Sequence, residues 1–94
     1  MNPYRQKELI ELYLLALLRK RTMTEPELLL EVDDWLASDY TAAKRCLLIL
    51  RLKKDCSRRL RHGKGIYYIT PKGAHRLSAF LRFYKAAAWI YQIM

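Results

Sequence analysis

The feature that most constrains the fold is a change in hydrophobic period close to residue 55. Residues 41–51 place their apolar side chains at intervals of three and four, which puts them on one face of a helix. Residues 56–61 alternate roughly, and residues 66–69 are rich in β-branched and aromatic side chains, which favour strands. Glycines between these two stretches indicate a turn over residues 62–65, so the sequence predicts a helix that ends near residue 54, followed by a β-hairpin. The residues on the apolar face of the helix are Ala43, Cys46, Leu47 and Leu50.

Helix-start signals occur at two places in the N-terminal half. Asn2 and Pro3 suit the N-cap and first helical positions, and they precede an amphipathic stretch that runs to about residue 21. Thr24 and Glu27 have the spacing of a capping box, which predicts a second helix. We expect that helix to end in a turn over residues 33–37. The fold class expected is mainly α with a small β-hairpin.

A fourth helix is expected at the C-terminus. Thr70 and Pro71 repeat the signals of a helix start, and neither Gly nor Pro follows Gly73, so a helix of about twenty residues is predicted. Its apolar face is wider than a core of this size needs, and residues 86–94 carry no charge. A second copy of the chain would cover such a patch, whereas membrane anchoring is a rival interpretation. The expected dimer interface comprises Leu77, Phe80, Leu81, Tyr84, Ala88, Trp89 and Tyr91.

The net charge of +9 is unevenly distributed along the 94 residues. Residues 44–76 hold eleven Lys and Arg side chains against Asp55 alone, whereas residues 1–39 hold five basic and eight acidic ones. Such a segment creates a local positive field, whose usual partner is a polyanion. Nucleic acid is therefore the predicted partner. An anionic membrane surface is less favoured, because the charges are not confined to one face of a single helix.

The residues that enzymes and metal sites require are not found in a suitable pattern. Cys46 and Cys56 do not form a disulfide framework or a zinc motif, and Asp33 and Asp34 have no third ligand at a metal-binding spacing. No nucleophile–base pair is visible, and the glycines of residues 63–65 lack the strand–loop–helix context of a phosphate loop. We therefore expect neither enzymatic activity nor a metal or cofactor. The N-terminus has no visible signal peptide, so a cytoplasmic location is expected.

Two motifs resemble those of winged helix-turn-helix repressors of bacteria and archaea. The pattern S..TAAKRCL..L over residues 38–50 is similar to their recognition helix, and YYITPKG...L over residues 67–77 is similar to the end of their wing. At residues 54–56 this chain has Lys-Asp-Cys, where the family usually has Gly and two apolar residues. The chain is most similar to PadR-like regulators and to small winged-helix proteins of viruses and mobile elements. In those proteins a long last helix makes the dimer.

The resemblance implies a three-helix, two-stranded winged-helix domain over residues 1–70 and a C-terminal dimerisation helix over residues 71–94, within one structural unit. It implies a homodimeric, sequence-specific regulator of transcription, a repressor, that binds double-stranded DNA. A small-molecule effector is not implied, because no ligand-binding domain is present. The roles of Thr41, Lys44 and Arg45 follow from the resemblance, and those of the wing follow from charge and geometry. The expected DNA-binding residues are Tyr40, Thr41, Lys44, Arg45, Leu48 and Arg51 on the recognition helix, and Arg58, Arg59, Arg61, His62 and Lys64 on the wing.

Several alternatives stay open at this point. Leu48 and Leu52 fall on the polar side of their helix, where they would contact thymine methyl groups or sugars, or be covered by the last helix. A winged helix also serves in some proteins as a protein-interaction module, and a copy encoded by a mobile element would inhibit a host complex. RNA binding shares the same charge signature.

Overall fold

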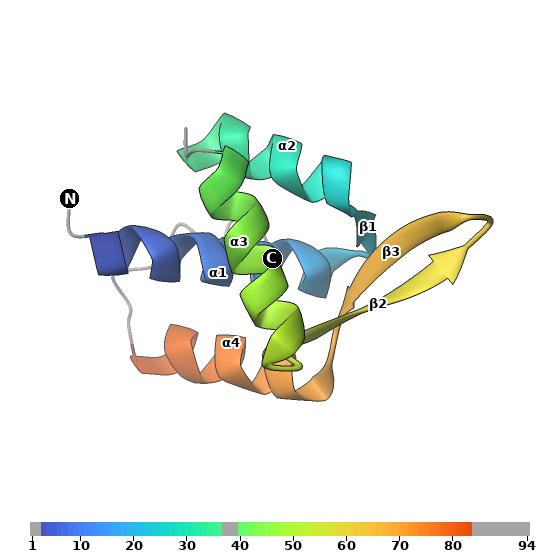
Figure 1. Ribbon diagram of the computed structural model, residues 1–94. Helices are drawn as coiled ribbons and strands as arrows, with labels where there is room; N and C mark the ends of the chain where they lie inside the picture. Colours follow the sequence, from blue (N-terminus) through green and yellow to red (C-terminus); the bar gives the residue numbers. More distant parts are fainter. Residues whose placement is uncertain (1–2, 37–39, 84–94) are drawn as a thin grey trace.

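The computed structural model describes residues 3–36 and 40–83, and these residues are mainly helical with a small three-stranded antiparallel sheet (Figure 1). Within them the chain forms four helices and three strands. The predicted class, mainly α with a β-hairpin, is confirmed at this level. The elements are α1 (Pro3–Lys20), β1 (Met23–Thr24), α2 (Glu25–Leu36), α3 (Tyr40–Leu52), β2 (Cys56–Arg61), β3 (Lys64–Ile69) and α4 (Pro71–Phe83).

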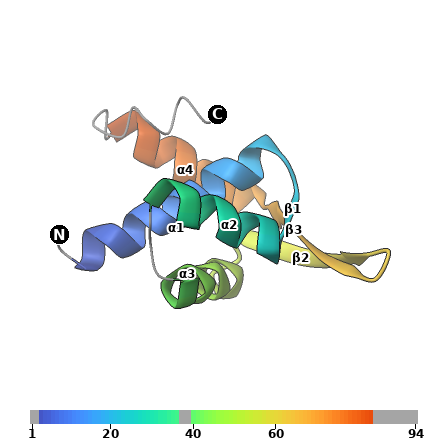
Figure 2. The same cartoon turned by 90° about the horizontal axis from the view of Figure 1, so that it is seen from above.

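Helix α1 forms the centre of the molecule. All nine residues from Ile10 to Leu18 are buried, so this part of α1 is covered on every side rather than on one broad face. Helices α3 and α4 lie on opposite sides of α1, and α2 packs against both α1 and α3 (Figure 2). The β2–β3 hairpin extends away from this helical body (Figures 1 and 2). No helix within the described residues combines the length and apolar character that crossing a membrane requires.

The capping box predicted at the start of α2 is confirmed. The Thr24 hydroxyl donates a hydrogen bond of 2.9 Å to Glu27 Oε1, and the Glu27 N–H approaches the Thr24 oxygen at 3.4 Å. Hydrogen bonds from the side chain and backbone of Thr24 lower the pKa of Glu27. The predicted end of this helix is wrong, because α2 continues to Leu36. Neither Gly nor Pro occurs between Asp33 and Leu36, and carboxylates alone do not end a helix.

A short strand before α2 makes the sheet three-stranded rather than two-stranded. Met23 pairs with Tyr67, and Thr24 pairs with Ile66, so that β3 lies between β1 and β2. Two residues are too few to show a strand period in the sequence. The consequence of the pairing is that the start of α2 is held beside the hairpin.

The hairpin has a shorter turn than predicted. Arg61 pairs with Lys64, which leaves only His62 and Gly63 in the loop, and Gly65 lies within β3. Both loop residues have positive φ, 52° at His62 and 76° at Gly63. That combination is the one whose twist matches the twist of paired antiparallel strands. The strands therefore extend almost to the tip of the hairpin.

Helix α3 ends in a Schellman motif, a hydrogen-bonded reversal that usually contains glycine. The N–H of Asp55 donates to the carbonyl of Leu50 at 2.9 Å, and the N–H of Lys54 donates to that of Arg51 at 3.1 Å. Lys54 occupies the left-handed position, with φ of 66°. At this position the chain departs from the winged-helix pattern, yet β2 still starts at Cys56 and pairs fully with β3.

The start of α4 is joined to that reversal. The predicted N-cap, Thr70, accepts a hydrogen bond from the N–H of Gly73 at 3.1 Å. Its hydroxyl also donates to the carbonyl of Lys54 at 2.6 Å. A Cβ at Gly73 would collide with the Asp55 carbonyl, so a side chain is excluded there. These contacts fix the corner at which α3, the hairpin and α4 meet.

A buried ionic network holds the same corner to the central helix. Arg76 of α4 donates to Asp55 Oδ2 at 2.6 Å and to Glu11 Oε2 at 3.0 Å. Both carboxylates are buried, whereas Arg76 is partly exposed. Although burial lowers the pKa of Arg76, its hydrogen bonds to Asp55 and Glu11 outweigh burial and raise it. Asp55, the one acidic residue of the basic segment 44–76, is therefore buried and paired with Arg76, so it stabilises the fold and does not weaken the positive surface.

Part of the predicted dimer interface belongs instead to the protomer's own core. Leu77 and Leu81 are buried because α4 packs directly against α1, and Phe80 is partly buried beside them. The predicted contact of Leu77 and Leu81 with a second copy is therefore wrong in this structure, since both side chains are buried within the protomer. Tyr84, Ala88, Trp89 and Tyr91, and the predicted continuation of the last helix, lie outside the described residues.

Candidate nucleic-acid interface

Helix α3 separates its apolar and cationic side chains as the sequence predicted. Its four apolar-face residues are all buried against the core. On the opposite face the side chains of Thr41, Lys44, Arg45, Leu48 and Arg51 are exposed. Tyr40 is the first residue of the helix, and its expected contact with DNA stays a prediction. The burial of one face fixes the orientation of the helix, so the cationic face points outward.

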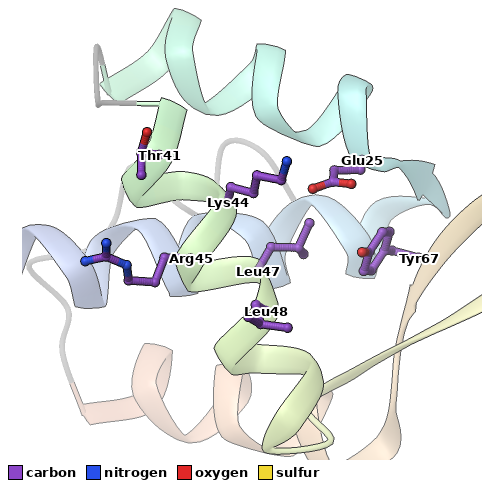
Figure 3. A pocket seen from close by; sticks show the side chains of 7 residues that line it. All are labelled: Glu25, Thr41, Lys44, Arg45, Leu47, Leu48 and Tyr67. Carbon is purple, nitrogen blue, oxygen red and sulfur yellow. The ribbon is translucent and has the colours of Figure 1, made fainter.

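Four of the predicted recognition-helix residues lie around one open groove of about 370 Å³ (Figure 3). In Figure 3 Lys44 extends towards Glu25 of α2, whereas Arg45 points along the other side of α3. Leu48 lies one turn further along the helix (Figure 3). The groove therefore combines cationic, hydroxyl and apolar groups on a surface formed by α2, α3 and β3. Its lining residues are Glu25, Thr41, Lys44, Arg45, Leu47, Leu48 and Tyr67.

Glu25 is a member of this surface that the sequence patterns do not predict. It is the first residue of α2, and it lies beside α3 because the β1–β3 pairing holds the start of α2 there. A carboxylate at this point weakens the positive field close to Lys44. It also offers an acceptor at the edge of the groove, which suits the amino group of cytosine. The only sequence signal was the preference of acidic residues for the first turn of a helix.

The five predicted wing residues are all exposed: Arg58, Arg59, Arg61, His62 and Lys64. The strand register divides them between the two faces of the hairpin, because neighbouring residues of a strand point to opposite sides.

Arg59 lies on the face of the hairpin that carries Tyr68. Its guanidinium carbon stands 4.3 Å from the centre of the Tyr68 ring, a cation–π contact. Of the two adjacent tyrosines, Tyr67 is buried, while Tyr68 is half-buried beneath Arg59. Stacking restricts the long Arg59 side chain and leaves its N–H groups available for a phosphate.

Arg58 lies on the other face, in a second open groove between the β2–β3 hairpin and the start of α2. Its guanidinium lies across Gly65, where a Cβ would overlap with it. Glu25 and Glu27 line the same groove as Arg58 and Lys64. The two cations of this groove therefore share their surroundings with carboxylates, which weakens their attraction for a polyanion. We expect Arg59 and Arg61 to contribute more of the hairpin's attraction for a polyanion than Arg58 and Lys64.

The thiols of the two cysteines do not line either groove, and their raised pKa values make them poorly reactive. Cys46 and Cys56 are both free and buried. Burial raises the pKa of Cys46, and burial together with the Asp55 charge raises that of Cys56 to about 11. Among residues 3–36 and 40–83, no group of three or more His, Cys, Asp and Glu side chains is arranged to hold a metal ion.

Comparisons with protein-family models, curated proteins and solved structures found no match to this chain. The resemblance to winged helix-turn-helix repressors therefore stays a prediction from the two sequence motifs.

Proposed function

We propose that this chain is a winged helix-turn-helix protein that binds double-stranded DNA and regulates transcription as a repressor. Helix α3 occupies a major groove, and the β2–β3 hairpin contacts the phosphate backbone or the adjacent minor groove. The observation that carries the proposal is the outward cationic face of α3, fixed by the burial of its apolar face and accompanied by a second cationic arm. Together these supply groups for base edges and for phosphates.

In this arrangement α3 selects the sequence and the wing supplies much of the affinity. Lys44 and Arg45 donate hydrogen bonds to base edges, since Arg and Lys pair with the O6 and N7 atoms of guanine. Thr41 lies at the start of the helix, where backbone phosphates pass. Arg59 and Arg61 contact phosphates, which position the protein but carry no sequence information.

Binding to selected DNA sequences tests the proposal. Sequences recovered from a random duplex pool should share a motif, and the Lys44→Ala, Arg45→Ala double variant should lose about tenfold or more of its preference for that motif. If about six to ten phosphates are neutralised, affinity should fall by about 10³–10⁵ between 50 and 200 mM salt. Fluorescence anisotropy with a labelled duplex measures both effects.

The matched control is the Lys7→Ala, Lys20→Ala double variant. It removes the same charge from exposed positions on α1, so it should weaken binding to all sequences slightly and keep the preference. Preference that survives the α3 double variant, or binding that salt does not affect, would contradict the proposal. Comparing duplex DNA with structured RNA at equal salt separates DNA binding from RNA binding.

A homodimer is part of this proposal. Because Leu77 and Leu81 are buried in the protomer, the residues proposed for the interface are Phe80, Tyr84, Ala88, Trp89 and Tyr91. Two-fold symmetry would then require a pseudo-palindromic site with half-sites about one helical turn apart. Sedimentation velocity should show a dimer for the native chain and a monomer for the Tyr84→Glu, Trp89→Glu variant.

The Leu30→Glu variant is the control for this substitution, since Leu30 is an exposed leucine on α2. It should leave the sedimentation coefficient unchanged. A native chain that sediments as a monomer at micromolar concentration would remove the dimer from the proposal. A dimer that survives the C-terminal substitutions would place the interface elsewhere.

One observation favours a protein-interaction module as the second candidate. Leu52 and Leu60 are among the most exposed large apolar side chains of the described residues, and both lie within the basic segment. If the chain shows no preference among duplex sequences, this candidate becomes the leading one.

A further inference from the structure

Two large apolar side chains are exposed on the cationic face of α3. Leu48 is 54% exposed and Leu52, one turn further along, is 72% exposed. Leu48 shares its groove with Lys44 and Arg45, whose side chains lie on the preceding turn (Figure 3). An exposed leucine is common on protein surfaces, but a leucine that lines a groove together with two cations calls for a specific partner.

Helix α4 is not that partner within the described residues. It packs on the side of α1 opposite to α3, so residues 71–83 do not cover Leu48 or Leu52 (Figure 2). Of the alternatives that the sequence left open, cover by this part of the last helix is therefore wrong.

The charges around Leu48 favour DNA over an apolar protein surface. Lys44, Arg45 and Arg51 surround it on the same helix, and burying them against an apolar partner would leave cations unpaired, at a high cost. A major groove supplies phosphates for the cations at its rims. On its floor it supplies one apolar group, the C5-methyl of thymine, which only one of the four bases carries.

We propose that Leu48 recognises a thymine methyl group in the major groove, so that each half-site contains a thymine next to the bases contacted by Lys44 and Arg45. This inference rests on the proposed DNA-binding function and adds base identity to it. Lys44 and Arg45 precede Leu48 by four and three residues, so the three side chains project from adjacent turns of one face. Contact with the methyl group removes apolar surface of both partners from water.

Replacing thymine by deoxyuridine tests this proposal, because the replacement removes the methyl group and keeps every hydrogen-bonding group of the base. Each thymine of a duplex carrying the selected motif is replaced in turn, and affinity is measured by fluorescence anisotropy. At least one position in each half-site should bind about fourfold more weakly without its methyl group. In the Leu48→Ala variant the same replacement should have no effect, which closes a double-mutant cycle.

Leu30→Ala is the matched control, since Leu30 is 63% exposed on α2 and lies outside both grooves. It should keep the full sensitivity to deoxyuridine. Tight, sequence-specific binding that is indifferent to every thymine methyl group would overturn the inference and leave the proposed function intact. Sensitivity that persists in full in Leu48→Ala would assign methyl recognition to another residue. A chain that selects no duplex sequence would overturn both proposals. A circular dichroism spectrum equal to that of the native chain verifies that each variant is folded.

Discussion

At the scale of single residues, the backbone conformation of Lys54 stands out. Lys54 and His62 are the two non-glycine residues with positive φ among those described. For residues other than Gly, Asn and Asp, the left-handed region costs about 1–2 kcal/mol, because Cβ approaches the following carbonyl oxygen. At Lys54 the two hydrogen bonds of the helix reversal hold this conformation in place.

Lys54→Gly should therefore stabilise the protein. Glycine removes the strain at φ of 66°, and its greater freedom in the unfolded chain offsets part of that gain. The expected increase in the free energy of unfolding is about 0.5–1 kcal/mol. Urea denaturation followed by circular dichroism measures it. Lys44→Gly is the matched control, because the same substitution inside α3 should lower stability by about 0.5–1 kcal/mol. A loss of stability in Lys54→Gly would show that the Lys54 side chain contributes more than its backbone strain costs.

At the scale of elements, the helices and their starts could be predicted because their signals are local. The capping box at Thr24 and Glu27 and the N-cap at Thr70 each depend on atoms three residues apart, so the sequence contains the whole interaction. The cationic face of α3 follows in the same way from helical spacing. The exposure of Lys44 and Arg45 was therefore predictable without knowledge of the fold.

Features that depend on distant partners could not be predicted. Strand β1 exists because Met23 and Thr24 find a partner more than forty residues away in β3. Arg76 joins Glu11 and Asp55, which are 65 and 21 residues away from it. The burial of Leu77 and Leu81 also depends on a distant partner, since their spacing fits a dimer interface and a core equally well. Only the packing of α4 on α1 decides between the two.

The candidate site likewise combines local features, which the sequence predicts, with features that depend on distant partners. Its cations belong to one helix and one hairpin, where spacing and charge identify them. Glu25 joins the α3 groove through the pairing of β1 with β3, and Gly65 accommodates Arg58 through the strand register. The balance of charge in the two grooves therefore became visible only in three dimensions.

At the scale of the whole molecule, a single core is organised around α1, and the two thiols belong to different parts of it. Cys46 faces the core from α3, where its Sγ lies 3.9 Å from the carbonyl of Lys7 in α1. Cys56 is buried at the start of β2, beside the corner held by Asp55 and Arg76. The two thiols thus report on the docking of α3 and on the integrity of that corner.

Alkylation should therefore report the cooperativity of the whole fold. At pH 8 a thiol whose pKa is about 11, as for Cys56, is ionised in about one molecule in a thousand, and only the thiolate reacts. Modification of either cysteine then requires opening of the core, after which the pKa returns to its ordinary value. If the core opens as one unit, iodoacetamide should modify both residues at equally slow rates that rise with urea in parallel with global unfolding. Mass spectrometry of the two peptides measures each rate separately.

The Leu60→Cys variant provides the reference for this measurement. Leu60 is exposed on the same strand as Cys56 and on the same face, so a thiol there should react at the rate of an unfolded peptide at every urea concentration. A Cys46 rate that is fast without urea and insensitive to it would contradict cooperative opening, and would mean that α3 undocks from α1 on its own. Because the orientation of α3 depends on that docking, such a result would also predict that the proposed DNA binding carries the cost of ordering α3. Equal slow rates would mean instead that the cationic face of α3 is fixed in place before any partner arrives.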